Sequence, residues 1–200
     1  IARAIESGEL PMKDVERKLE RLAALTAKYA CAQCDYGVDE DDRVVMAEGW
    51  RRALTARGNP QRPALGSKIR LVMRQDAVSD GVSEAGVTAG VLAQVLARRF
   101  DVETVTYADA ETFDWSTLPN DGRFVILAST SRVRYGPSAR SRFKPDLHLA
   151  LWNPYQALDF DAPALMTYGF AGPALDAVDA WLAGTLEATG HVPVPGFEDA

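Results

Sequence analysis

Residues 132–144 carry five cationic side chains and no acidic one, in a chain whose formal net charge is −6. Guanidinium groups can fork onto a carboxylate, a phosphate or sugar oxygens, and Tyr135 offers an apolar face beside them. The simpler alternative, which we favour, is that these arginines pair with acidic residues of this domain or of a neighbouring one. The five cations are Arg132, Arg134, Arg140, Arg142 and Lys144.

Other residues with reactive side chains are few. Cys31 and Cys34 form one Cys-x-x-Cys pair, which is half of a tetrahedral zinc site, and we expect reduced, packed thiols there. His148 lies in an apolar, strand-like run, which favours a hydrogen-bonded core or interface histidine, whereas His191 lies close to the end of the chain and could equally be a surface residue. The sequence has no Gly-x-Ser-x-Gly and no glycine-rich nucleotide motif. We therefore predict no catalytic residue, no metal and no cofactor.

Composition narrows the classes of partner. The chain has 200 residues, of which 47% are hydrophobic and 25% are charged, as in ordinary globular proteins. An acidic balance argues against binding to nucleic acid, and no apolar run reaches the roughly 20 residues that span a membrane. We expect a cytoplasmic protein. Because the chain begins at Ile1 in helix-like sequence, we also expect it to be a piece of a longer protein.

The first sixty residues read as helix. From Met12 onward, apolar residues recur at steps of three or four and place one apolar face on a long helix. An acidic loop and a second helix follow, and the second helix runs up to the stop signal Gly58-Asn59-Pro60. Residues 1–60 are therefore predicted as a helical linker. The apolar face consists of Val15, Leu19, Leu22, Leu25 and Tyr29.

The rest of the chain alternates between strands and helices. Strand-like apolar runs begin near residues 68, 102, 124, 147 and 164, and a final helix runs from Pro173 to Gly184. Such runs predict an α/β fold over residues 61–200, a three-layer αβα sandwich with a mainly parallel sheet. Ligands gather at the carboxyl ends of such strands. The loops expected there supply the candidate substrate or domain-interface residues Asp80, Arg132, Arg134, Tyr135, Asn153 and Tyr168.

Four short segments near the end of the chain follow a recognisable order. They are Leu151-Trp152-Asn153-Pro154-Tyr155, the run from Asp161 to Gly169, Ala177 to Leu182 with Gly184, and the run from Ala188 to Val194. With the run from Ala53 to the strand at Ile69, this order resembles the second domain of glycoside hydrolase family 3. The resemblance extends over residues 47–194 and leans toward the β-N-acetylhexosaminidase branch.

The resemblance implies that the catalytic residues lie in a different domain from this one. In that family a (β/α)₈ barrel precedes the αβα domain and supplies the aspartate nucleophile, and the hexosaminidase branch places its histidine and aspartate proton donor on a barrel loop. Glucosidase relatives place a glutamate acid on the second domain, but residues 130–144 contain no glutamate. This chain is thus expected to be an accessory domain, inactive alone, with the barrel and a carbohydrate substrate as partners. Residues 1–60 would include the end of the barrel.

The residues alone are compatible with two other functions. One is a stand-alone α/β module that binds a small ligand or a carbohydrate through Arg132 and Arg134. The other is a self-sufficient hydrolase that uses His148 or His191.

Overall fold

A computed structural model describes residues 1–29, 37, 39–76 and 86–197. The chain forms two compact units, Ile1–Asp39 and Glu40–Ala200. Three residues singled out in the sequence, Cys31, Cys34 and Asp80, lie outside the described residues. Among the described helices, none is both long and apolar enough to cross a membrane.

The first unit is helical, as predicted. It contains α1 (Ala2–Glu6) and α2 (Met12–Lys28), and α2 begins directly after Pro11. Asp14 in the first turn and Lys28 in the last complement the helix dipole. No residue of α2 is buried, and Leu19 and Leu22 are each 58% exposed. The predicted apolar face is therefore present and is not buried within the first unit.

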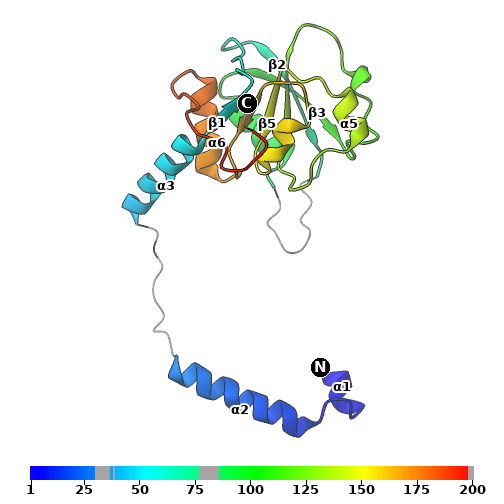
Figure 1. The fold of residues 1–200 in the computed structure, drawn as a ribbon, viewed down its shortest axis with the longest axis vertical. Coiled ribbons are helices and arrows are strands. Elements are labelled where there is room, and N and C mark those ends of the chain that lie inside the picture. Colours follow the sequence, from blue (N-terminus) through cyan, green and yellow to red (C-terminus); the bar gives the residue numbers. More distant parts are fainter. Residues whose placement is uncertain (30–36, 38, 77–85, 198–200) are drawn as a thin grey trace. The chain divides into compact units, whose positions relative to one another are not determined.

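The second unit contains one six-stranded sheet in the order β1-β6-β5-β4-β2-β3 (Figure 1). The strands β2 to β6 pair in parallel with one another, whereas β1 pairs antiparallel with β6 at one edge. This arrangement confirms the predicted α/β fold with a mainly parallel sheet. The strands are β1 (Thr55–Arg57), β2 (Lys68–Arg74), β3 (Asp101–Tyr107), β4 (Phe124–Ser129), β5 (Leu147–Ala150) and β6 (Ala164–Met166).

Helices cover the sheet on both faces, which gives three layers (Figure 1). On one face, α4 packs against β2, and residues of α4 and α6 share one buried cluster with alternate residues of β2, including Leu71. On the other face, Val72 joins a cluster that includes Phe143, just after α5. This alternation buries both sides of a strand that reads as one apolar run. The helices are α3 (Glu40–Ala53), which packs on α6, α4 (Ala89–Leu96), α5 (Pro137–Arg142) and α6 (Gly172–Leu182), with short 3₁₀ turns η1 (Trp115–Thr117) and η2 (Pro154–Leu158).

The helix before β1 is shorter than the sequence predicts. It ends at Ala53, and the next residues form β1 instead of continuing to Gly58. Thr55 pairs with Met166 of β6, so tertiary pairing overrides the helical pattern at these positions.

One strand position carries a buried charge that the sequence did not single out. Arg70 in β2 is only 1% exposed, and its guanidinium donates to Glu103 at 2.7 Å and to Asp121 at 2.9 Å. Arg123 contacts the same two carboxylates. Burial alone lowers the pKa of Arg70, but the hydrogen bonds to the two carboxylates outweigh it, so the pKa is raised overall. This cluster ties β2 and β3 to the turn before β4.

Candidate functional site

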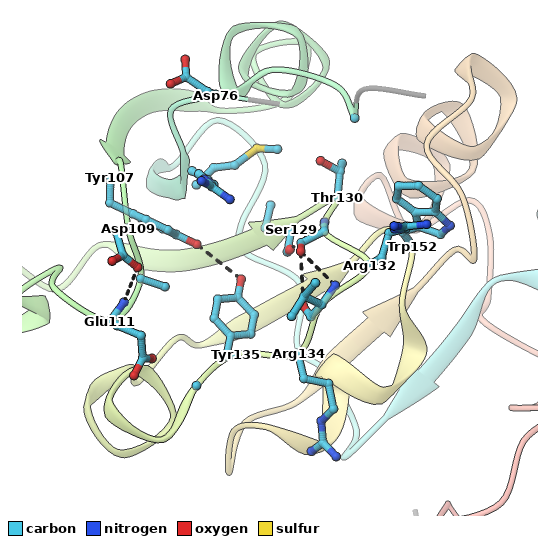
Figure 2. A pocket seen from close by; sticks show the side chains of 18 of the residues that line it. Asp76, Tyr107, Asp109, Glu111, Ser129, Thr130, Arg132, Arg134, Tyr135 and Trp152 are labelled. Carbon is cyan, nitrogen blue, oxygen red and sulfur yellow. Dashed lines mark hydrogen bonds between the residues drawn. The ribbon is translucent and has the colours of Figure 1, made fainter. Parts of the chain in front are cut away.

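A cavity of about 410 Å³ lies at the carboxyl ends of the parallel strands (Figure 2). The chain passes from β2 to β3 on one side and then returns to form β4 on the other side of β2. Such a reversal leaves a crevice where ligands bind in open α/β sheets. The cavity is lined by residues that end or follow β2, β3, β4 and β5, among them Arg74, Asp76, Tyr107, Asp109, Ser129, Thr130, Arg132 and Trp152.

The ends of β2 and β3 supply groups of both charges. Arg74 and Tyr107 are paired residues of the two strands, and Asp76 and Asp109 follow them. Burial raises the pKa of the Tyr107 hydroxyl, against the effect of the nearby Arg74 charge. The carboxylate of Asp109 accepts a hydrogen bond of 2.9 Å from the backbone N–H of Glu111. One wall of the cavity is thus polar, with a buried phenol in it.

Hydroxyl groups fix the loop after β4. Ser129 Oγ accepts from the backbone N–H of Ser131 at 3.1 Å, and Ser131 Oγ accepts from that of Val133 at 3.0 Å. Thr130 sits against Gly86, where a Cβ atom would lie only 1.9 Å from Thr130 Oγ1. A side chain at position 86 would therefore force Thr130 to move.

The arginine-rich loop is largely tied to the protein itself. Arg134 Nε donates to the carboxylate of Asp159 at 2.7 Å, and Arg140 Nε lies 3.2 Å from the same carboxylate. The backbone N–H of Tyr135 donates to its second oxygen at 2.9 Å. The favoured prediction, pairing with acids of this domain, is confirmed for Arg134 and Arg140. The guanidinium of Arg134 points away from Thr130 and Trp152 in Figure 2.

A second carboxylate, that of Glu111, supports the same loop. It accepts hydrogen bonds from the backbone N–H groups of Ser138 (3.2 Å) and Ala139 (3.1 Å) at the start of α5. A Cβ on Gly136 would lie 2.5 Å from the Glu111 carboxyl carbon, so glycine leaves room for this contact. Glu111 thereby supplies the cap that α5 lacks from its own preceding residue.

Three of the predicted site residues, Arg132, Arg134 and Tyr135, line the cavity. Tyr135 is only 7% exposed and packs edge-on against Phe160, so the expected apolar face for a ligand is not available. Its hydroxyl lies 3.5 Å from that of Tyr107 (Figure 2). Tyr135 therefore supports the cavity wall from within the core.

The predicted residues Asn153 and Tyr168 lie outside the lining of this cavity. Asn153 caps η2 through Tyr155 N–H (3.0 Å) and donates to the backbone oxygen of Arg132 at 2.6 Å. Tyr168 has a positive φ of 61°, and its hydroxyl donates to Thr55 Oγ1 in β1 at 3.0 Å. Both side chains hold loops in place.

Sequence reasoning named none of Arg74, Tyr107, Asp109 and Trp152 as a site residue, and it quoted Trp152 only within the segment that carries the family resemblance. All four end or closely follow a strand that the sequence predicts. Position at or just after a strand end was thus the signal that could have found these four residues.

His148 is a core residue, as predicted, but the expected hydrogen bond is wrong. It is 1% exposed and packs edge-on against Phe160 with ring centroids 5.2 Å apart. Neither ring nitrogen has a hydrogen-bond partner among the described residues. Burial lowers the pKa of His148 to about 3. A neutral, enclosed imidazole of this kind has no access to a substrate, which argues against a hydrolase built on His148.

The described residues hold no group of three or more histidine, cysteine, aspartate or glutamate side chains arranged for a metal ion. The cavity is instead a mixture of hydroxyl, guanidinium, carboxylate and indole groups. Such a surface can bind and orient a polar ligand through hydrogen bonds.

No model of a known protein family matches the sequence, and no curated protein matches it. Solved structures do share its fold. One is a family 3 β-N-acetylglucosaminidase from Paenibacillus. The aligned region covers 96% of this chain and 41% of the Paenibacillus chain, with a TM-score of 0.60 and 16% sequence identity. Another is a fungal multi-domain family 3 β-N-acetylglucosaminidase. The aligned region covers 100% of this chain and 25% of the fungal chain, with a TM-score of 0.62 and 23% sequence identity.

A third solved structure is a β-glucoside phosphorylase, which matches 100% of this chain and 41% of its own, with a TM-score of 0.54 and 16% identity. The chain thus spans less than half the length of each of these three proteins. At these identities the similarity establishes the fold.

Proposed function

We propose that this chain is the accessory αβα domain of a family 3 glycoside hydrolase that resembles the β-N-acetylhexosaminidases. In this role it supports a preceding barrel domain and brings loops near the sugar site, and it does not catalyse alone. The observation that carries the proposal is the shared fold, which corresponds to 41% of the length of the Paenibacillus enzyme. The ordered segments between Leu151 and Val194 add support.

The apolar face of α2 agrees with this role. Leu19, Leu22 and Leu25 are each more than half exposed on a helix with no buried residue. Apolar side chains gathered on one face favour burial against another surface. Under this proposal, the apolar face of α2 packs against the preceding domain.

Two of the carboxylates near the cavity are committed to contacts within the domain. Glycoside hydrolysis needs two carboxyl groups that flank the scissile bond and reach it. Asp159 is held by Arg134 and by the Tyr135 N–H, and Glu111 is held by the first turn of α5. Neither of these carboxylates is placed to attack or protonate a substrate.

The proposal is tested by comparing two proteins, the 200-residue chain and the same chain with its upstream polypeptide. Each is incubated with an aryl N-acetylglucosaminide and an aryl glucoside, with and without inorganic phosphate. We expect turnover of the N-acetylglucosaminide by the longer protein only, independent of phosphate. Turnover by the 200-residue chain alone, or an inactive longer protein, would overturn the proposal. Phosphate-dependent turnover of the glucoside would replace the hexosaminidase assignment with a phosphorylase.

A further inference from the structure

We propose that Trp50 of α3 is a positioning residue for the cavity at the strand ends, because it fixes the orientation of Trp152 through the loop after β6. Trp152 lines the cavity, whereas Trp50 lies outside its lining. The loop comprises residues 167–171, between β6 and α6. This role is additional to the proposed function, and only its expected effect on turnover rests on that function.

The side chain of Trp50 lies directly on Gly169 of this loop. A Cβ atom at position 169 would lie 2.5 Å from Trp50 Cη2 and 3.2 Å from Cζ3, so the outer edge of the indole occupies the space that a side chain would need. Trp50 is half-buried, and its helix packs on α6, which follows the loop. The indole of Trp50 therefore limits where the backbone of the loop can lie.

The neighbouring residue, Tyr168, gives the loop a second connection to the end of α3. Its hydroxyl donates to Thr55 Oγ1 at 3.0 Å, and Thr55 Oγ1 donates at 2.9 Å to the carbonyl oxygen of Ala53, the last residue of α3. Tyr168 has a φ of 61°, a left-handed conformation that costs free energy in residues other than glycine and persists where the surroundings hold it. Trp50 and this pair of hydroxyl groups thus hold adjacent residues of the loop.

The same loop contacts Trp152 and the residue before it. The Phe170 ring meets the indole of Trp152 edge-on, with ring centroids 5.3 Å apart and planes at 75°. Thr167 is 2% exposed, and its Oγ1 lies 3.2 Å from the carbonyl oxygen of Leu151, which directly precedes Trp152. Both the ring and the adjoining backbone of Trp152 are thus in contact with residues that lie within two positions of Gly169.

These contacts give the cavity a preformed aromatic side. Trp152 is half-buried and forms the side of the cavity away from Tyr107 and Asp109 (Figure 2). A half-buried ring takes its orientation from the residues that pack on it, and a ring that is already fixed loses less entropy when a ligand arrives. We therefore expect Trp50 to affect ligand affinity without touching the ligand.

The indole N–H signals of the four tryptophans, recorded by NMR on the ¹⁵N-labelled 200-residue chain, test this role. Trp50→Leu should shift the Trp152 signal and lower its order parameter to the range below about 0.6 that marks flexible groups. The signal of Trp115, which stacks on Phe143 with ring centroids 4.8 Å apart, should stay unchanged. An unchanged Trp152 signal in the folded variant would overturn the proposal.

Val45→Ala is the matched control on the same helix. Val45 is 69% exposed, so its truncation should leave the Trp152 signal as it is in the parent chain. If Val45→Ala disturbs Trp152 as much as Trp50→Leu does, the effect comes from the helix as a whole and the proposal fails. Thermal melts of both variants separate a local change at Trp152 from loss of folding.

Exchanging the sizes of the two contacting residues tests the connection through Gly169. Gly169→Ala should displace the indole of Trp50 and disturb Trp152. Gly172→Ala is the matched control, since a Cβ there has no contact within 4 Å among the described residues outside its own helix backbone. Adding Trp50→Phe to Gly169→Ala shortens the ring, leaves room for the new methyl group and should return Trp152 toward its parent signal. A double variant as disturbed as Gly169→Ala alone would overturn the proposal, and this pair decides the question if Trp50→Leu does not fold.

Turnover extends the test to the longer protein of the proposed function. With the aryl N-acetylglucosaminide, Trp50→Leu should raise KM by about fivefold and leave kcat within about twofold, because an indole fixed before binding contributes to affinity. A loss of kcat with KM unchanged would contradict the positioning role. An inactive parent protein would count against the proposed function alone, since the NMR comparison requires no turnover.

Discussion

Arg134 donates from Nε to the carboxylate of Asp159 at 2.7 Å, and the side chain of that aspartate is completely buried. The pair joins the loop after β4 to the segment after η2, and so it fixes one side of the cavity. A buried carboxylate keeps its charge only when donors surround it. Asp159 has three such donors, from Arg134, Arg140 and the Tyr135 backbone.

We expect Asp159→Asn to reduce the free energy of unfolding by about 2 kcal/mol, since charge-assisted hydrogen bonds are lost and two guanidinium groups lose their counter-ion. Urea denaturation measures the change. The matched control is Asp161→Asn, an exposed aspartate two residues away, which should change stability by less than about 0.5 kcal/mol. Equal effects of the two substitutions would contradict the role assigned to Asp159.

Gly136→Ala is expected to push the Glu111 carboxylate off the first turn of α5, because the new Cβ would lie 2.5 Å from its carboxyl carbon. Loss of this cap should cost about 1 kcal/mol of stability. Glu111→Ala should cost a similar amount, and the double variant should cost little more than either one. Additive costs in the urea denaturation of the three variants would show that the two residues act separately.

Gly86→Ala is expected to destabilise the chain by about 1 to 3 kcal/mol, since the added methyl group meets Thr130 at 1.9 Å. Gly90→Ala in α4 is the matched control, because the nearest atom to its added Cβ lies 3.9 Å away. The control should stabilise the chain by up to about 1 kcal/mol through helix propensity. Thermal melts of both variants check the opposite signs, and a neutral Gly86→Ala would contradict the close packing.

His148 should make stability depend on pH in the acid range. Burial lowers the pKa of its folded form to about 3, whereas an unfolded histidine titrates near 6.5. Between these values the unfolded chain binds a proton that the folded chain excludes, so stability falls as pH drops from about 6.5 toward 3, with a limiting slope of about 1.4 kcal/mol per pH unit.

The His148→Leu variant should lose this part of the pH dependence. Urea midpoints measured at several pH values between neutrality and about pH 4 give the comparison. His191→Gln changes an exposed histidine and should follow the parent profile. Parallel profiles for His148→Leu and the parent chain would show that another group controls acid stability.

The sheet could be predicted because its signals are local. The apolar runs that form β2, β4 and β5 are bounded by turn residues, and each buried strand can be read without knowing its neighbours. The end of α3 was less predictable. Thr55–Arg57 became a strand because β6 was available to pair with it, which no local pattern records.

The site was harder to predict because its contacts join distant positions. Arg134 meets Asp159 across 25 residues, and Asn153 meets Arg132 across 21. The excess of arginine correctly indicated a loop that lines the cavity. Arg134 of that loop, however, is paired with an acidic residue of the same domain. Tyr168 was predicted from its place in a loop at a strand end, but its hydroxyl bonds to Thr55, 113 residues away, and it lies outside the cavity lining.

The antiparallel strand β1 also affects how the sheet ends. It occupies the outer side of β6, and Thr55 forms a further bridge to Thr189, so the chain's own segments partly cover this border. At the opposite border, β3 carries the exposed Asp101 and the half-exposed Glu103. Charges on an outer strand discourage pairing with a second molecule. The two borders thus differ: one is partly covered by the chain's own Thr189, and the other carries charged side chains.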